Sequence, residues 1–560
     1  METNSADLKK LFNEKKYSII VDIIENKISE KDKNSGLLNL LGVCKFLNNS
    51  NKETLKSAKE DFRRAYLKEK DTPNAFHALK NFINISMDLF DIEFRSGEAC
   101  NDKIFEEILS YFKENENYFK KNEGLAQSII RVFKRNLDLD NVINYLKKII
   151  EHNDKNIDAL CTYIYFNCFK NDWSQKNFLE YSRLLNKKLP LYPKEKLTSL
   201  KENKDKKINL AFLSSDIRSN HSVSFFLKTV LINYNKEKFN IFIYFNNQKE
   251  DKTSNEFKKY VFKSRNIFHL NDIEAINLIR SDKIDIIIDL MGITSSHRLP
   301  LFKNRIAKNQ LLWCGYNNTT GVDHMDYLIS DKYLILENEE NLYSEKIIRL
   351  ENIWNCHSGF SGNREFIEPP FKTNKYVTFC SFNNFRKIND NVINVWSSIL
   401  KQVPNSKLIL SPSDTASFSI ISKKFKNKGV LDSIIFQTYK KNYEDHLNEY
   451  KNIDIALDTF PYNGVTTSFE AIWMGVPVLT IKGYNFNSRT GESINNNLDL
   501  KELVSEGEED YIKKAVSYCA DTDKIINLRK IIFDKALKSP LFDKEKFSNQ
   551  FYTSLEKINK

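Results

Sequence analysis

The chain has 560 residues, of which 41% are hydrophobic and 28% charged, with only 15 glycines and 11 prolines. This composition is ordinary for a globular protein and excludes collagen-like, low-complexity and wholly disordered chains. The 85 Lys and Arg against 74 Asp and Glu give a net charge of +11, spread without an Arg cluster or a basic tail, so we expect no nucleic-acid partner.

Targeting and redox signals are weak. The first residues, METNSADLKK, lack the basic and apolar segments of a secretory signal, and the longest apolar run, 284–293, is far shorter than the ~18 residues that a membrane span needs. The eight cysteines contain no C-x-x-C pair, so neither a disulfide framework nor a zinc site is indicated. We therefore expect a cytoplasmic protein with free thiols and no membrane span.

Residues 1–200 are predicted to form an all-α domain, because apolar residues recur there at three- and four-residue spacing. Leu41-Gly42 in one segment, followed by Ala58, Phe62 and Ala65 in the next, resembles the tetratricopeptide helix pair, and a further pair lies at 142–166. An irregular helical domain without repeats is the alternative. Stacked helix pairs offer an extended concave surface, which we expect to hold a polypeptide.

Two α/β units follow, predicted at 201–370 and 371–560. A charged linker with prolines (187–207) and a second one with two prolines (363–374) mark their beginnings. Short β-branched runs alternate with helical segments in both units, which is typical of buried parallel strands: KINLAFLSS, FNIFIYF, IDIIIDLMG and NQLLWCGY in the first unit, and YVTFCSF, SKLILSP, IDIALDTF and VPVLTIKG in the second. The sequence predicts two facing Rossmann-like domains with a ligand in the cleft at the carboxyl ends of their strands.

Several common chemistries lack their motifs. No G-x-G-x-x-G follows the first strand, and neither a G-x4-G-K-[ST] loop nor an H-E-x-x-H helix occurs in the chain. Hydride transfer, ATP hydrolysis and a metal centre are therefore disfavoured, and we expect no cofactor. If this cleft holds a diphosphate, side chains and amide groups must neutralise it.

The strongest candidate for such a site is the strand–turn–helix segment DTFPYNGVTTSFE (458–470). Gly464 permits a tight turn, and Thr466 and Thr467 stand where a helix begins. A helix N-terminus is a natural seat for phosphate, because its amide groups are unpaired and carry a partial positive charge. Glu470, one turn further, can accept hydrogen bonds from ribose. The alternatives are a plain Thr-Thr cap and a solvated glutamate.

A second cluster, SFNNFRKIND (381–390), follows the first strand of the later α/β unit. Lys387 can place a positive charge on a diphosphate, and Asn384 can donate to a phosphate oxygen. A departing nucleoside diphosphate develops negative charge, which a metal-free site must stabilise with such groups. The alternative is a basic pair on the surface at the start of a helix.

Two histidines complete the candidate site. His221 follows the first strand of the earlier α/β unit in SSDIRSNHSVSFF, where an imidazole facing the cleft can act as a general base. A structural helix cap is the alternative for this residue. His446 lies on a helix that leads into the strand before Asp458, where it can touch a nucleobase or ribose, or simply belong to the core.

Together, SSDIRSNHSVSFF, FCSFNNFRKI and HLNEYKNIDIALDTFPYNGVTTSFEAIWMGVPVLTIKG resemble the catalytic region of the O-GlcNAc transferase and SPINDLY family over residues 208–555. The resemblance implies a GT-B fold after tetratricopeptide repeats. It also implies inverting, metal-independent transfer of a sugar from a nucleotide donor to Ser or Thr of a protein held partly by the repeats. It suggests His221 as the base, Asn384, Lys387, Thr466 and Thr467 at the diphosphate, and His446 and Glu470 at the nucleoside.

The donor depends on one departure from the family pattern. Animal O-GlcNAc transferases have His where Val465 stands, and that His contacts the donor, whereas SPINDLY-like O-fucosyltransferases lack it. This departure weakens the case for UDP-GlcNAc and keeps GDP-fucose as the alternative. UDP-GlcNAc is still the favoured donor, because the larger part of the family that the chain resembles is assigned to it. A bacterial-type protein N-glucosyltransferase ranks third. A different class of function, an inactive scaffold that binds partners through its helical repeats, is also kept.

Overall fold

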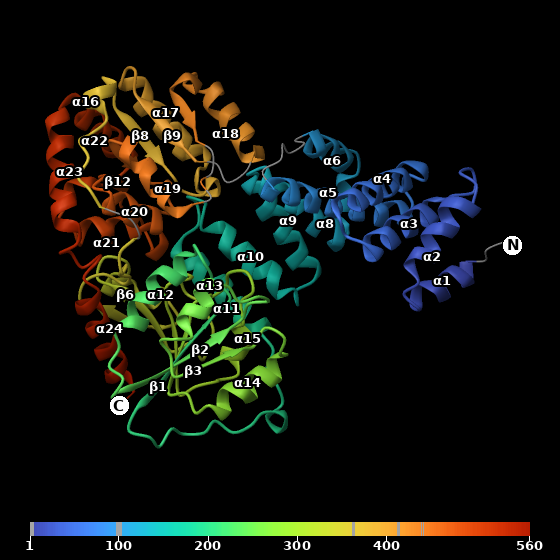
Figure 1. The fold of residues 1–560 in the computed structure, drawn as a ribbon, viewed down its shortest axis with the longest axis horizontal. Helices are drawn as coiled ribbons and strands as arrows, with labels where there is room; N and C mark the ends of the chain where they lie inside the picture. Colours follow the sequence, from blue (N-terminus) through green and yellow to red (C-terminus); the bar gives the residue numbers. More distant parts are fainter. Residues whose placement is uncertain are drawn as a thin grey trace. The chain divides into compact units, whose positions relative to one another are not determined.

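The computed structural model describes residues 5–96, 103–360, 364–411, 415–437, 440 and 442–559. It separates into two compact units, drawn in Figure 1. The first unit takes residues 1–154 and the short segment 414–420, and the second takes 155–413 and 421–560.

Every element in the described part of residues 1–154 is helical, as the apolar spacing predicts. Asparagine begins several of these helices: the side-chain oxygens of Asn34, Asn51 and Asn122 each accept a hydrogen bond from the backbone N–H three residues later, at 2.9–3.0 Å. The elements are α1 (Ser5–Asn13), α2 (Tyr17–Asp22), η1 (Ile23–Lys27), α3 (Ser35–Asn48), α4 (Lys52–Lys68), α5 (Pro73–Ser96), α6 (Lys103–Glu114), α7 (Glu116–Lys121), α8 (Glu123–Arg135) and α9 (Leu139–His152).

Helices α3 and α4 meet at the residues of the predicted helix-pair pattern. A Cβ on Gly42 would lie 2.7 Å from the ring of Phe62, so only glycine lets the two helices approach this closely. Ala58 and Ala65 are fully buried on the same side of α4. The expected all-α domain is thus confirmed in its described part, and the assignment to tetratricopeptide repeats stays a prediction.

The second unit begins earlier than the predicted domain boundary at residue 200. Helices α10 (Ile157–Asn167) and α11 (Gln175–Lys188) belong to it because their polar side chains bond to the α/β region. Gln175 Nε2 donates to Asn318 Oδ1 at 2.7 Å, and the Ser182 hydroxyl donates to the carbonyl of Thr319 at 3.1 Å. The two helices are therefore part of the framework that carries the α/β halves.

Two parallel sheets form the centre of the second unit (Figure 1). The first, in the order β3-β2-β1-β4-β5-β6-β7, belongs to the N-terminal half, the name used here for residues 201–370. Its strands are β1 (Ile208–Ser214), β2 (Phe239–Phe245), β3 (Lys263–Asn266), β4 (Ile286–Asp289), β5 (Asn309–Leu312), β6 (Tyr327–Asp331) and β7 (Lys346–Leu350).

The second sheet, in the order β10-β9-β8-β11-β12-β13, belongs to the C-terminal half, residues 371–560. Its strands are β8 (Thr378–Ser381), β9 (Lys407–Leu410), β10 (Ile434–Phe436), β11 (Ile455–Leu457), β12 (Val478–Ile481) and β13 (Val504–Ser505). In both sheets the strand order reverses beside the first strand, as in doubly wound folds, so loops diverge there and leave room for a ligand. The predicted pair of Rossmann-like halves, a GT-B arrangement, is confirmed.

Helices cover both sheets, and the residues of the central strands are buried because they pack beneath those helices, whereas the edge strands β3, β7 and β10 are partly exposed. The helices are α12 (Ser222–Ile232), α13 (Lys252–Phe257), α14 (Asp272–Ser281), α15 (Leu299–Lys303), α16 (Phe371–Asn374), α17 (Asp390–Gln402), α18 (Thr415–Asn427), α19 (Tyr443–Glu449), α20 (Thr466–Trp473), α21 (Thr490–Asn496), α22 (Glu508–Ala520), α23 (Thr522–Ala536) and α24 (Lys544–Ile558).

The last helix, α24, returns to the N-terminal half although the sequence places it in the predicted domain 371–560. The hydroxyl of Tyr552 donates to the carbonyl of Val230 on α12 at 2.8 Å, and the ring of Phe551 packs 4.8 Å from that of Trp313. Figure 1 shows this red helix beside the green elements of the N-terminal half. The chain therefore ties its two halves together at its end.

Seven of the eight cysteines lie in the described residues and all seven are free, as expected, while Cys100 lies outside them. None of the described helices combines the length and the apolar character needed to traverse a bilayer.

Candidate active site

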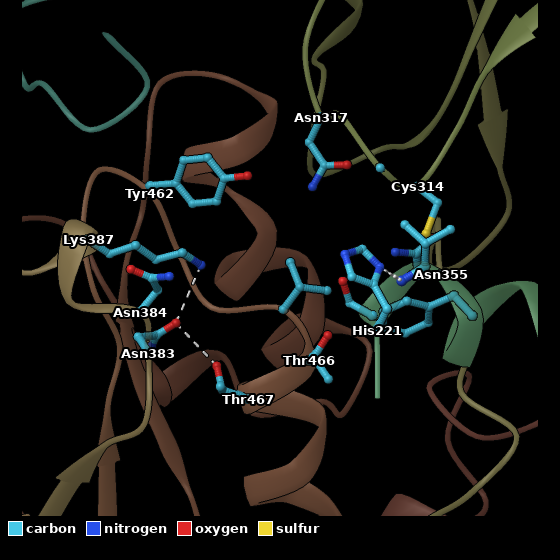
Figure 2. A pocket seen from close by; sticks show the side chains of 15 residues that line it. His221, Cys314, Asn317, Asn355, Asn383, Asn384, Lys387, Tyr462, Thr466 and Thr467 are labelled. Carbon is cyan, nitrogen blue, oxygen red and sulfur yellow. Dashed lines mark hydrogen bonds between the residues drawn. The ribbon is translucent and has the colours of Figure 1, made fainter. Parts of the chain in front are cut away.

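A pocket of about 210 Å³ lies between the two halves of the second unit (Figure 2). One wall comes from the C-terminal half, through the segments that follow β8 and β11. The other comes from the N-terminal half, through the segments that follow β1, β5 and β7. Six of the sequence-predicted residues line it, namely His221, Asn384, Lys387, Val465, Thr466 and Thr467.

Lys387 is the cation of the C-terminal wall. It ends the short helix η4 (Phe385–Lys387) just beyond β8, and its Nζ donates to the carbonyl of Asn463 at 2.7 Å. The same Nζ lies 4.5 Å from the ring centroid of Tyr462. Burial lowers the pKa of Lys387 to about 8, although the Asp458 carboxylate acts in the opposite direction. The lysine is therefore still mostly protonated at neutral pH and is held against a neutral carbonyl.

The buried carboxylate of Asp458 closes the loop that carries this carbonyl. It accepts hydrogen bonds from the N–H groups of Thr459 at 2.9 Å and Gly464 at 2.7 Å, and from the hydroxyl of Thr480 at 2.9 Å. Gly464 is required because a Cβ there would lie 2.5 Å from Thr467 Oγ1. Burial raises the pKa of Asp458 to about 6, since those bonds only partly offset the cost of burying its charge. Gly464 therefore fixes the shape of this loop, although it does not itself line the pocket.

Helix α20 presents its first turn to the pocket. Val465 stands at the N-cap position and provides no side-chain cap, so the first amide groups keep their hydrogen-bonding capacity and the helix dipole stays positive there. Thr466 and Thr467 follow, and the Thr467 hydroxyl donates to Asn383 Oδ1 at 3.2 Å. Asn384 caps η4 by accepting from the next-but-one N–H at 3.0 Å. This wall is suited to a phosphate-bearing ligand.

Glu470 and His446 come together, but neither lines the pocket. Glu470 is 3% exposed and lies 3.1 Å from His446 Nε2, and it also accepts from the hydroxyls of Tyr443 and Tyr450. Burial alone would lower the pKa of His446, but the hydrogen bond to Glu470 and its charge raise it above the usual value. Their predicted contacts with the nucleoside stay predictions.

His221 is the titratable group of the N-terminal wall. It caps α12, with Nδ1 3.4 Å from the N–H of Val223, and its Nε2 lies 3.5 Å from Asp216 Oδ1. Burial lowers the pKa of His221 below its usual value, with Asp216 opposing the shift and Arg218 adding to it. The ring is therefore neutral at neutral pH and can accept a proton, while the nearby carboxylate can stabilise the cation that results.

Sequence reasoning did not name seven polar or aromatic side chains of the pocket as site residues: Ser222, Phe226, Cys314, Asn317, Asn355, Asn383 and Tyr462. Ser222, Phe226, Asn383 and Tyr462 lie inside motifs quoted from the sequence. Cys314 lies near the end of the predicted strand segment NQLLWCGY and Asn317 directly after it, so placement at a strand end was a usable signal. Asn355 lies in the connection after β7 and reaches the pocket only through tertiary packing.

Within the described ranges, no group of three or more His, Cys, Asp or Glu side chains is placed to hold a metal ion. The positive charge available to a diphosphate at this pocket comes from Lys387 and from the start of α20. The predicted independence of metal remains a prediction.

Comparisons with known proteins agree on this architecture. The profile of glycosyl transferase family 41 matches residues 178–359 and 371–551. A Solanum lycopersicum protein named "probable UDP-N-acetylglucosamine–peptide N-acetylglucosaminyltransferase SPINDLY" is 31% identical over 371 residues, which cover 64% of this chain and 39% of that protein. An Arabidopsis thaliana protein with the same enzyme name and the suffix SEC is 28% identical over 355 residues, 60% of this chain and 36% of its own.

Among solved structures, a mutant of the Thermobaculum terrenum O-GlcNAc transferase superposes with a TM-score of 0.79 at 20% identity, covering 100% of this chain and 98% of that one. This similarity shows the shared fold. The matched region of the curated relatives is about two fifths of their length.

Proposed function

Since the chain belongs to glycosyl transferase family 41, we propose that it transfers a sugar from a nucleotide-sugar donor to a Ser or Thr hydroxyl of a protein, with inversion and without a metal ion. The single observation that carries this proposal is the division of the pocket. A half-buried lysine and an uncapped helix start form one wall, and a neutral histidine paired with a carboxylate lies across from them.

The reaction follows from these positions. The diphosphate lies at Lys387 and the start of α20, and the acceptor hydroxyl approaches from the side of His221. The hydroxyl oxygen bonds to the anomeric carbon as the bond from that carbon to the phosphate oxygen breaks, and the proton passes to the imidazole of His221. The nucleoside diphosphate leaves with its electron pair, and Lys387 and the α20 amides stabilise the added negative charge. A single displacement of this kind inverts the anomeric centre.

UDP-GlcNAc is the donor that we favour, because the related plant proteins carry names that specify it. Val465 supports GDP-fucose as the alternative, since its side chain brings no hydrogen-bonding group to the pocket at a position where the sequence resemblance links histidine to UDP-GlcNAc. The acceptor is a protein, and we assign part of its binding to the helices of residues 1–154.

The test is nucleoside diphosphate release by the purified chain from UDP-GlcNAc, GDP-fucose and UDP-glucose in turn, with and without lysate proteins, in EDTA. Release that depends on lysate and on one donor supports the proposal, and mass spectrometry of the acceptors identifies the modified residue. Modified Asn would favour the N-glucosyltransferase instead. No release from any donor, with Lys387→Ala indistinguishable from wild type, would favour the scaffold.

A further inference from the structure

The N-terminal wall of the pocket carries two asparagines, and the first of them sits on a backbone that cannot shift. Asn317 follows β5 in a tight turn. A Cβ on Gly315 would lie 1.8 Å from the carbonyl oxygen of Leu290, and one on Gly292 would lie 2.5 Å from Tyr316 Cβ. Two glycines therefore let this turn lock against the end of β4. The position of Asn317 is fixed before any ligand arrives.

The second asparagine, Asn355, is held from both sides. The carbonyl of Trp354 accepts a hydrogen bond from Trp313 Nε1 at 2.9 Å, and the carbonyl of Cys356 accepts one from the hydroxyl of Thr229 at 2.8 Å. The residues on both sides of Asn355 are thus tied to separate elements of the N-terminal half. The side chain between them is directed by the framework and not by a flexible loop.

Both side chains nevertheless keep an unused acceptor. Asn317 is 7% exposed and Asn355 is 1% exposed, and the Oδ1 atom of each has no hydrogen-bond partner among the described residues. A buried acceptor without a partner is costly, so two of them on one pocket wall point to a ligand that completes them.

We propose that Asn317 and Asn355 select the transferred sugar, by accepting hydrogen bonds from its hydroxyl or amide N–H groups. This inference rests on the proposed function and deepens it. Figure 2 shows both asparagines on the wall across from Lys387. With the diphosphate at Lys387, the part of the donor that reaches this wall is the sugar. Two acceptors there favour a sugar that presents donors on that face over one that presents a methyl group.

Leucine has the same branched side-chain skeleton as asparagine, with two methyl groups in place of the amide oxygen and nitrogen, so Asn317→Leu and Asn355→Leu test the two groups separately. Asn394→Leu makes the same change on the exposed side of α17 and serves as the control. Calorimetry measures the affinity of each protein for UDP and for UDP-GlcNAc, and turnover is measured with UDP-GlcNAc and with analogues that each lack one sugar hydroxyl. GDP, GDP-fucose and its deoxy analogues replace them if the wild type uses GDP-fucose.

We expect each pocket variant to lose about 10- to 100-fold in kcat/KM, because one hydrogen bond to a buried acceptor is worth that much discrimination. Affinity for the free nucleoside diphosphate stays unchanged, which also shows that the variant has folded. For at least one deoxy analogue, removal of the hydroxyl should lower kcat/KM of the wild type by this factor but leave kcat/KM of one variant almost unchanged. That variant already lacks the asparagine oxygen to which the hydroxyl would donate.

The inference is overturned if both variants use the parent donor as well as wild type does, or if every missing hydroxyl costs wild type and variants equally. Failure of the proposed function looks different, because wild type then releases no nucleoside diphosphate at all. In that case the calorimetry decides. If wild type binds the nucleotide sugar more tightly than the free nucleotide and the variants lose this difference, the two asparagines select the sugar although the protein does not transfer it. If wild type shows no such difference in affinity, or the variants keep it, the assignment of sugar selection to Asn317 and Asn355 is overturned as well.

Discussion

The two walls of the pocket differ in how many of their polar side chains already have a hydrogen-bond partner within the protein. On the C-terminal wall, Lys387 already bonds to a carbonyl of the Asp458 loop, and Thr467 already bonds to Asn383. On the N-terminal wall, the oxygens of Asn317 and Asn355 have no partner among the described residues. Side chains of the C-terminal wall thus pair with groups of the same wall, whereas two acceptors of the N-terminal wall are left for a ligand.

This difference separates affinity from selectivity. The diphosphate is the same in UDP- and GDP-sugars, so a preformed cation and helix start can bind it at little reorganisation cost. Sugars differ in the placement of hydroxyl groups, and discrimination between them requires acceptors that stay unsatisfied when the wrong sugar enters. Variants of the C-terminal wall should therefore lower kcat/KM for all donors by the same factor, whereas variants of the N-terminal wall should change which donor has the highest kcat/KM.

The largest effect is expected from Lys387→Ala. Without this cation the leaving diphosphate loses its nearest positive charge, so kcat/KM should fall about a thousandfold for every donor. The melting temperature should stay near that of wild type, because the lysine is partly exposed to the pocket. Turnover assays and thermal unfolding check both statements, with Lys401→Ala on the exposed side of α17 as the control. A loss confined to one sugar would contradict the assignment of this wall to the diphosphate.

His221→Ala should come next, with kcat reduced about a hundredfold because the acceptor hydroxyl loses its base. Affinity for UDP should not change, since the imidazole lies on the other wall. Pre-steady-state turnover and calorimetry separate the two quantities, and His269→Ala, at an exposed histidine, is the matched control. Weaker UDP binding with an unchanged rate constant would place His221 on the donor instead of the acceptor.

The same contrast shows what could be read from the sequence. Periodicity predicted both sheets, and DTFPYNGVTTS and SFNNFRK predicted most of the C-terminal wall, because its residues lie within short segments at strand ends. The N-terminal wall is assembled from three segments more than 130 residues apart at their extremes, so only His221 was found. Asn355 could not be predicted because its position depends on hydrogen bonds to Trp354 and Cys356 from distant elements.

A smaller effect is expected at Gly464. A Cβ there would meet the hydroxyl of Thr467 at 2.5 Å and Asn383 Oδ1 at 2.9 Å, so Gly464→Ala must displace the bond between those two side chains. We expect kcat/KM to fall about tenfold for all donors through this misplacement. Gly507→Ala, where a Cβ would meet nothing within 4 Å, is the matched control. Full activity in Gly464→Ala would show that the C-terminal wall is less rigid than its hydrogen bonds indicate.

The pH dependence of kcat/KM tests the comparison further, because each wall supplies one titrating group. The group of the C-terminal wall must be protonated and that of the N-terminal wall must be deprotonated. Lys387 must be protonated, and its pKa is about 8, so at pH 8.5 the rate constant should fall about fourfold below its plateau.

His221 must be neutral, and burial lowers its pKa, so activity should persist as the pH falls through 6.5 and decline only below it. Affinity for UDP should follow the alkaline limb alone, since we assign the diphosphate to the C-terminal wall. If UDP affinity instead followed the acid limb, the roles of the two walls would have to be exchanged.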